Sequence, residues 1–476
     1  MSKKIDLPPT ATLSRRRFLR GIALGTATLA AGALAACGSS TPPANAPAGN
    51  ATAAPAGAPA SDATAAPAAP AQASGDVIKA RAMMWANSPV LDENYKTRTA
   101  MFNKQFEGKY QIDMQILPYD QYWSKLDLAY ASKQPIDVYA WDDQAYSHYK
   151  AGLLRNLEEY VKLVPDLSNA DQYPLDLEKF WRFDGSNLYA LPENLQMMAL
   201  YYNKDIFDKA GIKYPDDTWT YETMLDVAKK LTVTQGDQTS QWGLDMGAMG
   251  AWWGVQTLGW AAGAAFFDKV IEPTKFTVSD PRNVEGMQFI QDLIYKHKVA
   301  PDAAQRQAAA QDTGIFQTGK IAMIMDGTWY MSSNKDVTFK WDMAPLPKWK
   351  DKRALPFWFG GWVVAKDSKA SEAAVKFATW SATEYQKTLT ETKDWIPVRR
   401  EERESAKMQE TLPAGFKSVM ATLGEAQIGD MYHGKGQQII NEIINPTLDQ
   451  LWNNKLTPEE AAKQIDDKAN ALLQKA

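Results

Sequence analysis

Residues 189–232 read YALPENLQMMALYYNKDIFDKAGIKYPDDTWTYETMLDVAKKLT, and this stretch decides the expected fold. It begins with Leu-Pro, continues as a predicted strand, and then carries Tyr-Asn-Lys-x-x-Phe-x-x-Ala-Gly. A proline and the pair Thr218-Trp219 follow, and a predicted helix closes the stretch. A strand followed by helices is the repeating unit of α/β proteins. We therefore expect an α/β fold.

The same alternation continues on both sides of this stretch. Apolar residues at three- and four-residue spacing predict amphipathic helices, and short apolar runs between them predict strands. The predicted strands are at 77–86, 110–119 and 136–143, and the predicted helices at 93–109, 119–132, 280–298 and 457–475. Asp280 and Thr457 each precede a proline, as helix N-caps do, and Glu460 completes a capping box with Thr457. The pattern is typical of an α/β fold with mainly parallel sheets.

The first 36 residues are predicted to be a signal peptide. A basic region containing Arg15 and Arg16 precedes an apolar run at 22–36, which holds 15 residues. A membrane-spanning helix needs about 20 residues, so the run is too short to be an anchor. The Ser-Arg-Arg-x-Phe-Leu pattern resembles a twin-arginine export signal. An ordinary secretory signal is the alternative.

Cys37 follows the run in the sequence Leu-Ala-Ala-Cys, which resembles a bacterial lipobox. Cys37 is the only cysteine, so the chain has no internal disulfide, and we expect Cys37 to be the acylation site. Several acyl chains, at about 0.8 kcal/mol per buried CH₂, anchor a protein without a membrane helix. Residues 37–75 are rich in Ala and Pro and are expected to be a disordered tether. We therefore expect a lipid-anchored protein on the extracytoplasmic face of a bacterial membrane, in a periplasm or on the cell surface.

The remaining body, 76–476, is long enough for two domains. The formal net charge of the chain is −4, and removal of the six Lys/Arg and one Asp of the signal leaves −9. We find no basic stripe, so nucleic acid is not an expected partner. The hydrophobic stretches of the body are shorter than a membrane span, and we expect this part to be a soluble monomer.

Four segments of the body together resemble a known family. Besides 189–232, residues 314–331 carry Phe-x-x-Gly-Lys-x-Ala-Met followed by Gly-x-Trp, and residues 341–380 carry Pro-Leu-Pro, Gly-Gly and a helix. Residues 395–400 carry Pro-x-Arg. In this order, over essentially the whole body, they resemble the family-1 extracellular solute-binding proteins of bacterial ABC importers.

The resemblance implies a two-lobed, type II periplasmic-binding-protein-like α/β fold whose lobes close on a ligand by a hinge motion. Lobe 1 would comprise 76–190 plus 346–394, and lobe 2 would comprise 191–345 plus 395–476. The implied function is capture of a mono- or oligosaccharide and its delivery to the transmembrane subunits of an ABC permease. It implies a binding protein rather than an enzyme, with no cofactor and no metal.

Aromatic and polar side chains gather where predicted strands end. A sugar needs flat rings against its C–H faces and planar polar groups for its hydroxyls. Ligands of open α/β sheets bind outside the carboxyl ends of strands, which selects residues for the ligand site. The predicted ligand-binding residues are Trp85, Asn87, Trp141, Asp142, Asp143, Glu193, Asn194, Trp252, Trp253, Asp326, Trp329, Trp358, Gly361, Trp362, Trp395 and Arg399.

Not every tryptophan is assigned to the ligand. Trp123 is left open between core and cleft, and the tryptophans expected to pack in the core are Trp181, Trp219, Trp349, Trp380 and Trp452. In the helix expected after residue 250, Trp253 and Trp260 share a face and Trp252 points about 100° away. We expect Trp252 or Trp253 to form a ligand platform, and Trp260 to pack into its lobe.

Other functions stay open at this point. A polyamine would also bind between aromatic rings and carboxylates, and amino acids, peptides or glycerol phosphodiesters are further solutes. A glycosidase needs two carboxyl groups about 5–9.5 Å apart around one bond. The sequence offers no isolated acid pair of this kind, so an enzyme is the remote alternative.

Overall fold

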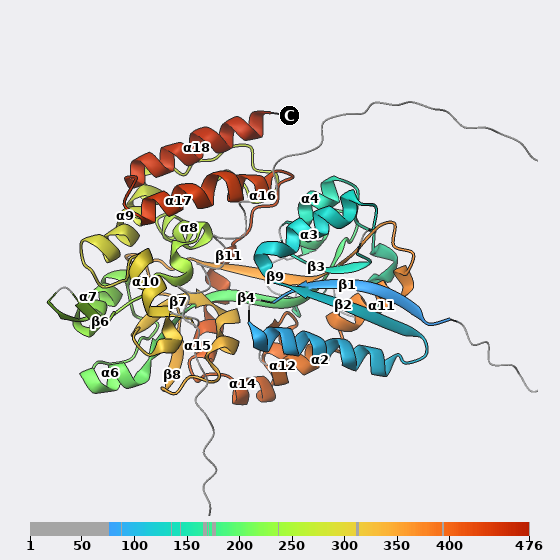
Figure 1. Cartoon of the computed structure of the whole chain (residues 1–476), viewed down its shortest axis with the longest axis horizontal. Helices are drawn as coiled ribbons and strands as arrows, with labels where there is room; N and C mark the ends of the chain where they lie inside the picture. The colour runs from blue at the N-terminus through green and yellow to red at the C-terminus, as the bar shows by residue number, and fades with distance from the viewer. Residues whose placement is uncertain are drawn as a thin grey trace, which may run out of the picture. The chain divides into compact units, whose positions relative to one another are not determined.

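The computed structural model describes residues 76–475, apart from 87, 135, 143, 165–168, 170, 174–177, 237, 311–313 and 393–394 (Figure 1). The predicted signal peptide at 1–36, Cys37 and the tether at 37–75 lie outside the described residues. Of the predicted site residues, Asn87 and Asp143 also lie outside them. Within the described part of the chain, no helix combines the length and the apolar character needed to cross a bilayer.

Three parallel strands begin the described chain. β1 (Ile78–Trp85) pairs in parallel with β2 (Tyr110–Leu117) and with β3 (Val138–Trp141). The accompanying helices are α2 (Pro89–Gln105), α3 (Tyr119–Ala131) and α4 (Ala145–Lys150). Helix α2 starts four residues before its predicted position because the Ser88 hydroxyl accepts a hydrogen bond from the Leu91 amide. Pro89 then fits the first turn, where its missing N–H costs nothing.

Two long strands, β4 (Ala190–Asn203) and β9 (Leu355–Val364), form the centre of the main sheet. They pair with each other in antiparallel fashion, and β9 is also antiparallel to β3 (Figure 1). The prediction of mainly parallel sheets is therefore wrong for the central strands. The reason is the course of the chain, because β4 leaves the part that holds β1–β3 and β9 returns to it.

The strands of the main sheet are completed from the second half of the chain. The distal part of β4 pairs antiparallel with β7 (Met323–Gly327) and β8 (Trp341–Ala344). Strand β10 (Ile396–Pro397) pairs antiparallel with β4, and β11 (Ala426–Ile428) pairs in parallel with β9. Strands β5 (Val233–Gln235) and β6 (Gln238–Gln241) form a separate hairpin. All residues of β4 are buried, including the polar side chains of Glu193, Asn194, Gln196 and Asn203.

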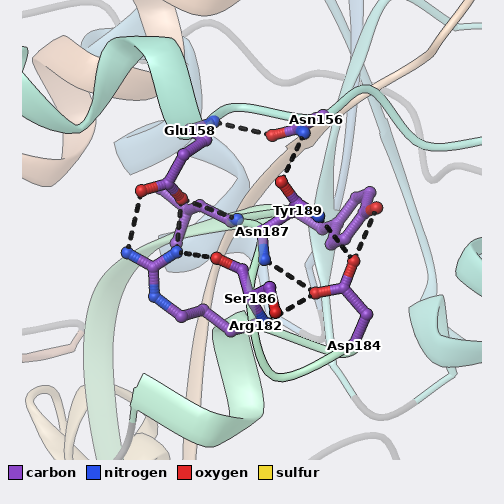
Figure 2. A network of polar contacts seen from close by, with 8 residues as sticks. Asn156, Glu158, Arg182, Asp184, Ser186, Asn187 and Tyr189 are labelled. Atoms are coloured by element: carbon purple, nitrogen blue, oxygen red, sulfur yellow. Dashed lines mark hydrogen bonds and ion pairs between the residues drawn. The ribbon is translucent and has the colours of Figure 1, made fainter.

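The chain enters β4 through a polar turn (Figure 2). The Asp184 carboxylate accepts hydrogen bonds from the backbone and side-chain amides of Asn187 and from the Tyr189 hydroxyl. Burial by itself raises the pKa of Asp184, but these hydrogen bonds outweigh it and lower the pKa to about 2. Glu158 forms an ion pair with Arg182 in the same network. The turn therefore holds the start of the central strand in place.

The motif that follows β4 contains the residues at which two helices begin or end. The Asn203 side chain accepts a hydrogen bond from the Ile206 amide and caps α6 (Lys204–Ala210). Gly211 ends this helix in the left-handed conformation, at φ +64°. Thr220 caps the next helix, α7 (Tyr221–Leu231). The Asn and Gly of the motif thus mark where one short helix begins and ends.

The remaining helices pack around the sheets. Their bounds are α5 (Glu178–Trp181), α8 (Trp252–Ala261), α9 (Pro281–Tyr295), α10 (Ala303–Ala310), α11 (Ser371–Ala382), α12 (Gln386–Thr392), α13 (Arg400–Arg403), α14 (Ala406–Thr411), α15 (Phe416–Ala421), α16 (Gly436–Ile439), α17 (Asn445–Trp452) and α18 (Pro458–Gln474). The 3₁₀ helices are η1 (Glu158–Leu163), η2 (Gly247–Gly250), η3 (Phe316–Thr318), η4 (Thr328–Asn334) and η5 (Leu423–Glu425), and η6 (Ile440–Ile444) is a π-helix. The N-cap at Asp280 and the capping box of Thr457 with Glu460 are confirmed.

The tryptophans expected in the core are buried, which confirms that prediction. Each of them is less than a tenth exposed, and they are Trp181, Trp219, Trp349, Trp380 and Trp452. Trp123 is also buried, in edge-to-face contact with Tyr122 and His148. Trp123 is therefore a core residue.

Candidate functional site

A cavity of about 460 Å³ is lined by segments that lie far apart in the sequence. Its wall comes from β1, β3, β4, β9, α8, η4 and the segment from α16 to α17. The predicted site residues that line it are Trp85, Trp141, Asp142, Glu193, Asn194, Trp252, Trp253, Trp329, Trp358, Gly361, Trp362 and Trp395. The structure thus brings together most of the described residues that were predicted from the sequence to bind the ligand.

Three half-buried indoles form one side of the cavity, and we call Trp253, Trp329 and Trp358 the tryptophan cage. The ring centroids of Trp253 and Trp358 are 4.8 Å apart, and those of Trp329 and Trp358 are 5.1 Å apart. The Trp253 and Trp329 rings are perpendicular, with centroids 6.0 Å apart. Edge-to-face packing of this kind fixes the rings while each keeps part of its surface open to the cavity.

The two neighbouring tryptophans of α8 differ in their surroundings. Trp252 is 5% exposed and contacts Phe267, with ring centroids 6.3 Å apart, although it also reaches the cavity wall. Trp253 belongs to the cage. Trp260 is half-buried and does not line the cavity. Between Trp252 and Trp253, the geometry favours Trp253 as the platform.

The floor of the cavity carries two amide side chains from β4. Asn194 lies opposite Gly360, and Gln196 lies opposite Trp358, so all four are on the same face of the β4–β9 pair. A Cβ at Gly360 would lie 3.3 Å from the Trp141 carbonyl oxygen and 3.4 Å from the Asn194 amide. The missing side chain therefore keeps the floor open.

Gln196 was not predicted from the sequence. Its Oε1 accepts a hydrogen bond from the Thr328 hydroxyl at 2.5 Å, and its Nε2 is buried with no hydrogen-bond partner among the described residues. The indole Nε1 of Trp141 is likewise buried without a partner in the described structure. Both are donors on the cavity wall. Gln196 could have been predicted from the sequence, because alternate residues of a strand lie on the same face and Gln196 is two residues after Asn194.

An acidic group, Asp142, also lines the cavity, directly after the end of β3. The Asp142 carboxylate accepts hydrogen bonds from the Tyr119 hydroxyl at 2.8 Å and from the Gln144 backbone amide at 2.9 Å. Gln144 Nε2 donates to the Tyr119 oxygen at 2.9 Å. Burial raises the pKa of Asp142 to about 6, and these hydrogen bonds limit the rise. Trp85 packs edge-to-face on Tyr119 beside them.

Glu193 reaches the wall but its charge is neutralised inside the protein. Its carboxylate forms an ion pair with Arg98 at 2.9 Å, and both side chains are 1% exposed. The same carboxylate accepts a hydrogen bond from Trp362 Nε1 at 2.5 Å. Trp395 is held in the same region by a 2.6 Å hydrogen bond from its Nε1 to the Tyr95 hydroxyl. These groups hold the wall in position.

Two predicted site residues do not line the cavity. Asp326 lies opposite Ala199 on β4, which faces away from Asn194 and Gln196 because successive strand residues alternate. The Asp326 carboxylate accepts a hydrogen bond from the Gly327 amide at 2.7 Å. Arg399 forms ion pairs with Glu401 and Glu402, each at 3.4 Å. Their strand-end positions were identified correctly, but their side chains are directed elsewhere.

The position of Asp326 gives a stability prediction. Burial raises the pKa of Asp326 to about 7, so the native state binds more protons than the unfolded state between about pH 4 and pH 7. The free energy of unfolding therefore falls as the pH rises through this window. We expect Asp326→Asn to be about 2 kcal/mol more stable than the parent at pH 8 and equal at pH 4. The full pKa shift of Asp326 corresponds to about 4 kcal/mol. Solvent access to the half-buried side chain reduces this free energy to the expected value.

Urea unfolding at both pH values measures the effect, with the exposed Asp113→Asn as the matched control. A difference between Asp326→Asn and the parent that is the same at pH 4 and pH 8 would show that the carboxyl charge is not its origin.

Further wall residues come from the C-terminal region. They are Asp430, Gln437, Ile440, Asn441 and Asn445. None was predicted. Gln437, Asn441 and Asn445 recur every four residues, a spacing that in a regular α-helix drifts by about 40° at each step.

Known proteins of similar sequence and structure identify the family of the chain. A sequence profile described as bacterial extracellular solute-binding protein matches residues 97–414, about two-thirds of the chain. The arabinooligosaccharide-binding protein of Bacillus subtilis is 22% identical over 85% of this chain and 94% of its own length. The sn-glycerol-3-phosphate-binding periplasmic protein UgpB of Agrobacterium fabrum is 22% identical over 83% of this chain and 92% of its own.

Among solved structures, an ABC substrate-binding protein of Listeria monocytogenes in complex with cycloalternan is similar to the chain. Its TM-score is 0.73 at 24% identity, over 84% of this chain and 99% of that one. This confirms the expected two-lobed type II fold. The matched profile and the fold agree: the chain belongs to the bacterial extracellular solute-binding proteins.

Proposed function

We propose that the protein captures a neutral carbohydrate in the cavity and delivers it to the permease of an ABC importer. The observation that carries the proposal is the tryptophan cage beside the amide side chains of Asn194 and Gln196 in one cavity. Indole faces bind the C–H faces of a sugar, and amides donate to and accept from its hydroxyls. The name of one relative, an arabinooligosaccharide-binding protein, supports the same ligand class.

The charges of the wall separate this proposal from its alternatives. The residues lining the described cavity include no Lys, Arg or His. Neither sn-glycerol 3-phosphate, for which the second relative is named, nor a glycerol phosphodiester would find a cationic side chain there. A polyamine needs several ionised carboxylates, whereas Glu193 is neutralised by Arg98, which leaves only Asp142 and Asp430 as further carboxyl groups of the described wall. A neutral polar ligand fits best.

The predicted lobes give the proposed binding motion. Lobe 1 (76–190 plus 346–394) contributes Trp85, Trp141 and Asp142 to the wall, and lobe 2 (191–345 plus 395–476) contributes two rings of the cage. A ligand held between both sets would shift the population of the protein toward a closed form that the permease recognises. We propose no enzymatic reaction for the site.

The lipid anchor belongs to the proposal as well. We propose that the chain is exported by the signal at 1–36 and acylated at Cys37, so that the tether at 37–75 holds the body on the extracytoplasmic face. The match to an extracellular family supports this location. Mass spectrometry of the mature protein checks it, since an acylated N-terminal Cys37 is expected and an unmodified one would contradict the anchor.

A ligand panel tests the function. Purified protein is titrated by calorimetry and by intrinsic tryptophan fluorescence with maltotriose, arabinotriose, mannotriose, glucose, sn-glycerol 3-phosphate and spermidine. We expect at least one sugar to bind with a Kd near 1 μM or below, equivalent to about 8 kcal/mol, with no product released. Binding of spermidine or sn-glycerol 3-phosphate together with failure of every sugar would overturn the proposal.

A further inference from the structure

One side of the cavity is formed by a continuous helical segment, 436–452, which comprises α16, η6 and α17. Three amide side chains of this segment line the cavity, and we call Gln437, Asn441 and Asn445 the amide strip. The Gln437 Oε1 is buried with no hydrogen-bond partner in the described part of the chain. Asn441 and Asn445 are exposed on the cavity side. The strip therefore offers unused polar groups to a ligand.

A regular α-helix would not align these three residues. Eight residues of α-helix turn through about 800°, which would leave Asn445 about 80° away from Gln437. The segment Ile440–Ile444 is instead a π turn, whose hydrogen bonds span five residues rather than four. The additional residue in the turn removes about 100° of rotation. Asn445 is thereby brought back to the face of Gln437.

The sequence contains a cause for this π turn. Pro446 has no N–H to donate to the Glu442 carbonyl four residues before it, and its ring clashes with that carbonyl in a regular helix. The Thr447 hydroxyl donates to the Ile443 carbonyl at 2.7 Å, which satisfies an acceptor of the turn. The far end of the segment is anchored because Trp452 Nε1 donates to the Gly250 carbonyl at 2.8 Å. Pro446 thus sets the register of the strip without lining the cavity itself.

The length of the strip limits the ligand. At 1.5 Å per residue, Gln437 and Asn445 are about 12 Å apart along the helix axis. A six-membered sugar ring built from bonds of about 1.5 Å spans about 3 Å, or about 6 Å with its hydroxyl groups. A single sugar unit therefore contacts only part of the strip.

We propose that the amide strip binds successive units of an oligosaccharide, and that the π turn imposed by Pro446 aligns it for this purpose. The inference rests on the proposed carbohydrate function and specifies it, because it assigns a ligand of at least two sugar units. Each amide pairs its donor and its acceptor with hydroxyl groups, so the affinity gained per unit depends on the spacing of the amides.

The test compares ligand lengths in the parent and in three variants. The probes are glucose, maltose and maltotriose, and arabinose, arabinobiose and arabinotriose, measured by calorimetry. We expect the parent to bind one trisaccharide at least tenfold more tightly than its monosaccharide. Asn445→Ala and Pro446→Ala should each lower the affinity for that trisaccharide about tenfold. The matched control Gln438→Ala, an amide on the exposed side of the same segment, should leave it within twofold.

Each result has a distinct meaning. Equal affinity of the parent for the monosaccharide and the trisaccharide would overturn the inference while the carbohydrate function stands. Unchanged trisaccharide affinity in Pro446→Ala, with an unchanged thermal midpoint, would overturn the assignment of the π turn. Failure of every sugar to bind the parent would refute the proposed function and the inference with it.

Discussion

Trp253→Ala is expected to weaken binding of the sugar selected by the ligand panel about 100-fold, which corresponds to about 2.7 kcal/mol. The Trp253 ring is half-buried and contacts both Trp358 and Trp329, so its loss removes one wall of the cage and loosens the other two rings. Each ring contact contributes about 0.5–1.5 kcal/mol beyond the burial of its area. Calorimetry gives the affinity, and thermal unfolding of the ligand-free protein gives the stability.

Trp252→Ala is the matched control, on the next residue of the same helix. Trp252 is 5% exposed and packs on Phe267, so we expect its replacement to lower the free energy of unfolding by about 3–5 kcal/mol. Trp253→Ala should cost clearly less stability because solvent already reaches the ring. If Trp253→Ala loses stability on the scale of the control while the affinity stays unchanged, Trp253 is a core residue and the cage is not the platform.

Arg98→Met is expected to lower the free energy of unfolding by about 3–5 kcal/mol. The substitution leaves the Glu193 carboxylate without its ion pair at a site where both side chains are 1% exposed. Burial disfavours the charge on Arg98, but the neighbouring Glu193 outweighs it and raises the Arg98 pKa above its ordinary value. Urea unfolding at pH 7 measures the loss. Sugar affinity should fall as well, because Glu193 also holds Trp362 in the wall.

The double variant Arg98→Met/Glu193→Leu separates the charge from the packing. Replacing both members of a buried ion pair with apolar residues of similar volume is often neutral or stabilising. We therefore expect the double variant to recover most of the stability lost in the single one. A single-variant loss below about 1 kcal/mol would mean that water or another group neutralises Glu193, contrary to the arrangement described here.

Much of the local structure could be predicted because its causes lie within a few residues. The capping box at Thr457 and Glu460 joins groups three positions apart, and the N-cap at Asp280 acts on the second residue after it. Both were predicted and both are confirmed. The strand ends that carry Trp85 and Trp141 were predicted from a rule about sheets, and both residues line the cavity. The family motif at 189–232 could likewise be identified from a single continuous segment of the sequence.

The directions of side chains could not be obtained in this way. Asp326 lies near the end of β7 and Trp329 follows that strand, only three residues later, yet only Trp329 lines the cavity. Which face Asp326 takes depends on its pairing with Ala199, more than a hundred residues earlier. Gln196 is part of the floor because it lies opposite Trp358 on another strand. Distant pairing decides these orientations, and a one-residue change of register reverses them.

The sequence by itself determined the α/β elements, their caps, the family resemblance and the concentration of indoles at strand ends. These depend on hydrogen bonds and apolar spacing within about four residues along the chain. The tertiary structure alone decided that β4 and β9 are antiparallel, that Glu193 is neutralised by Arg98, and that the amide strip and the cage line the same cavity. The physical reason is that each of these features depends on contacts between residues from distant parts of the chain. The residues next to them in the sequence do not determine such contacts.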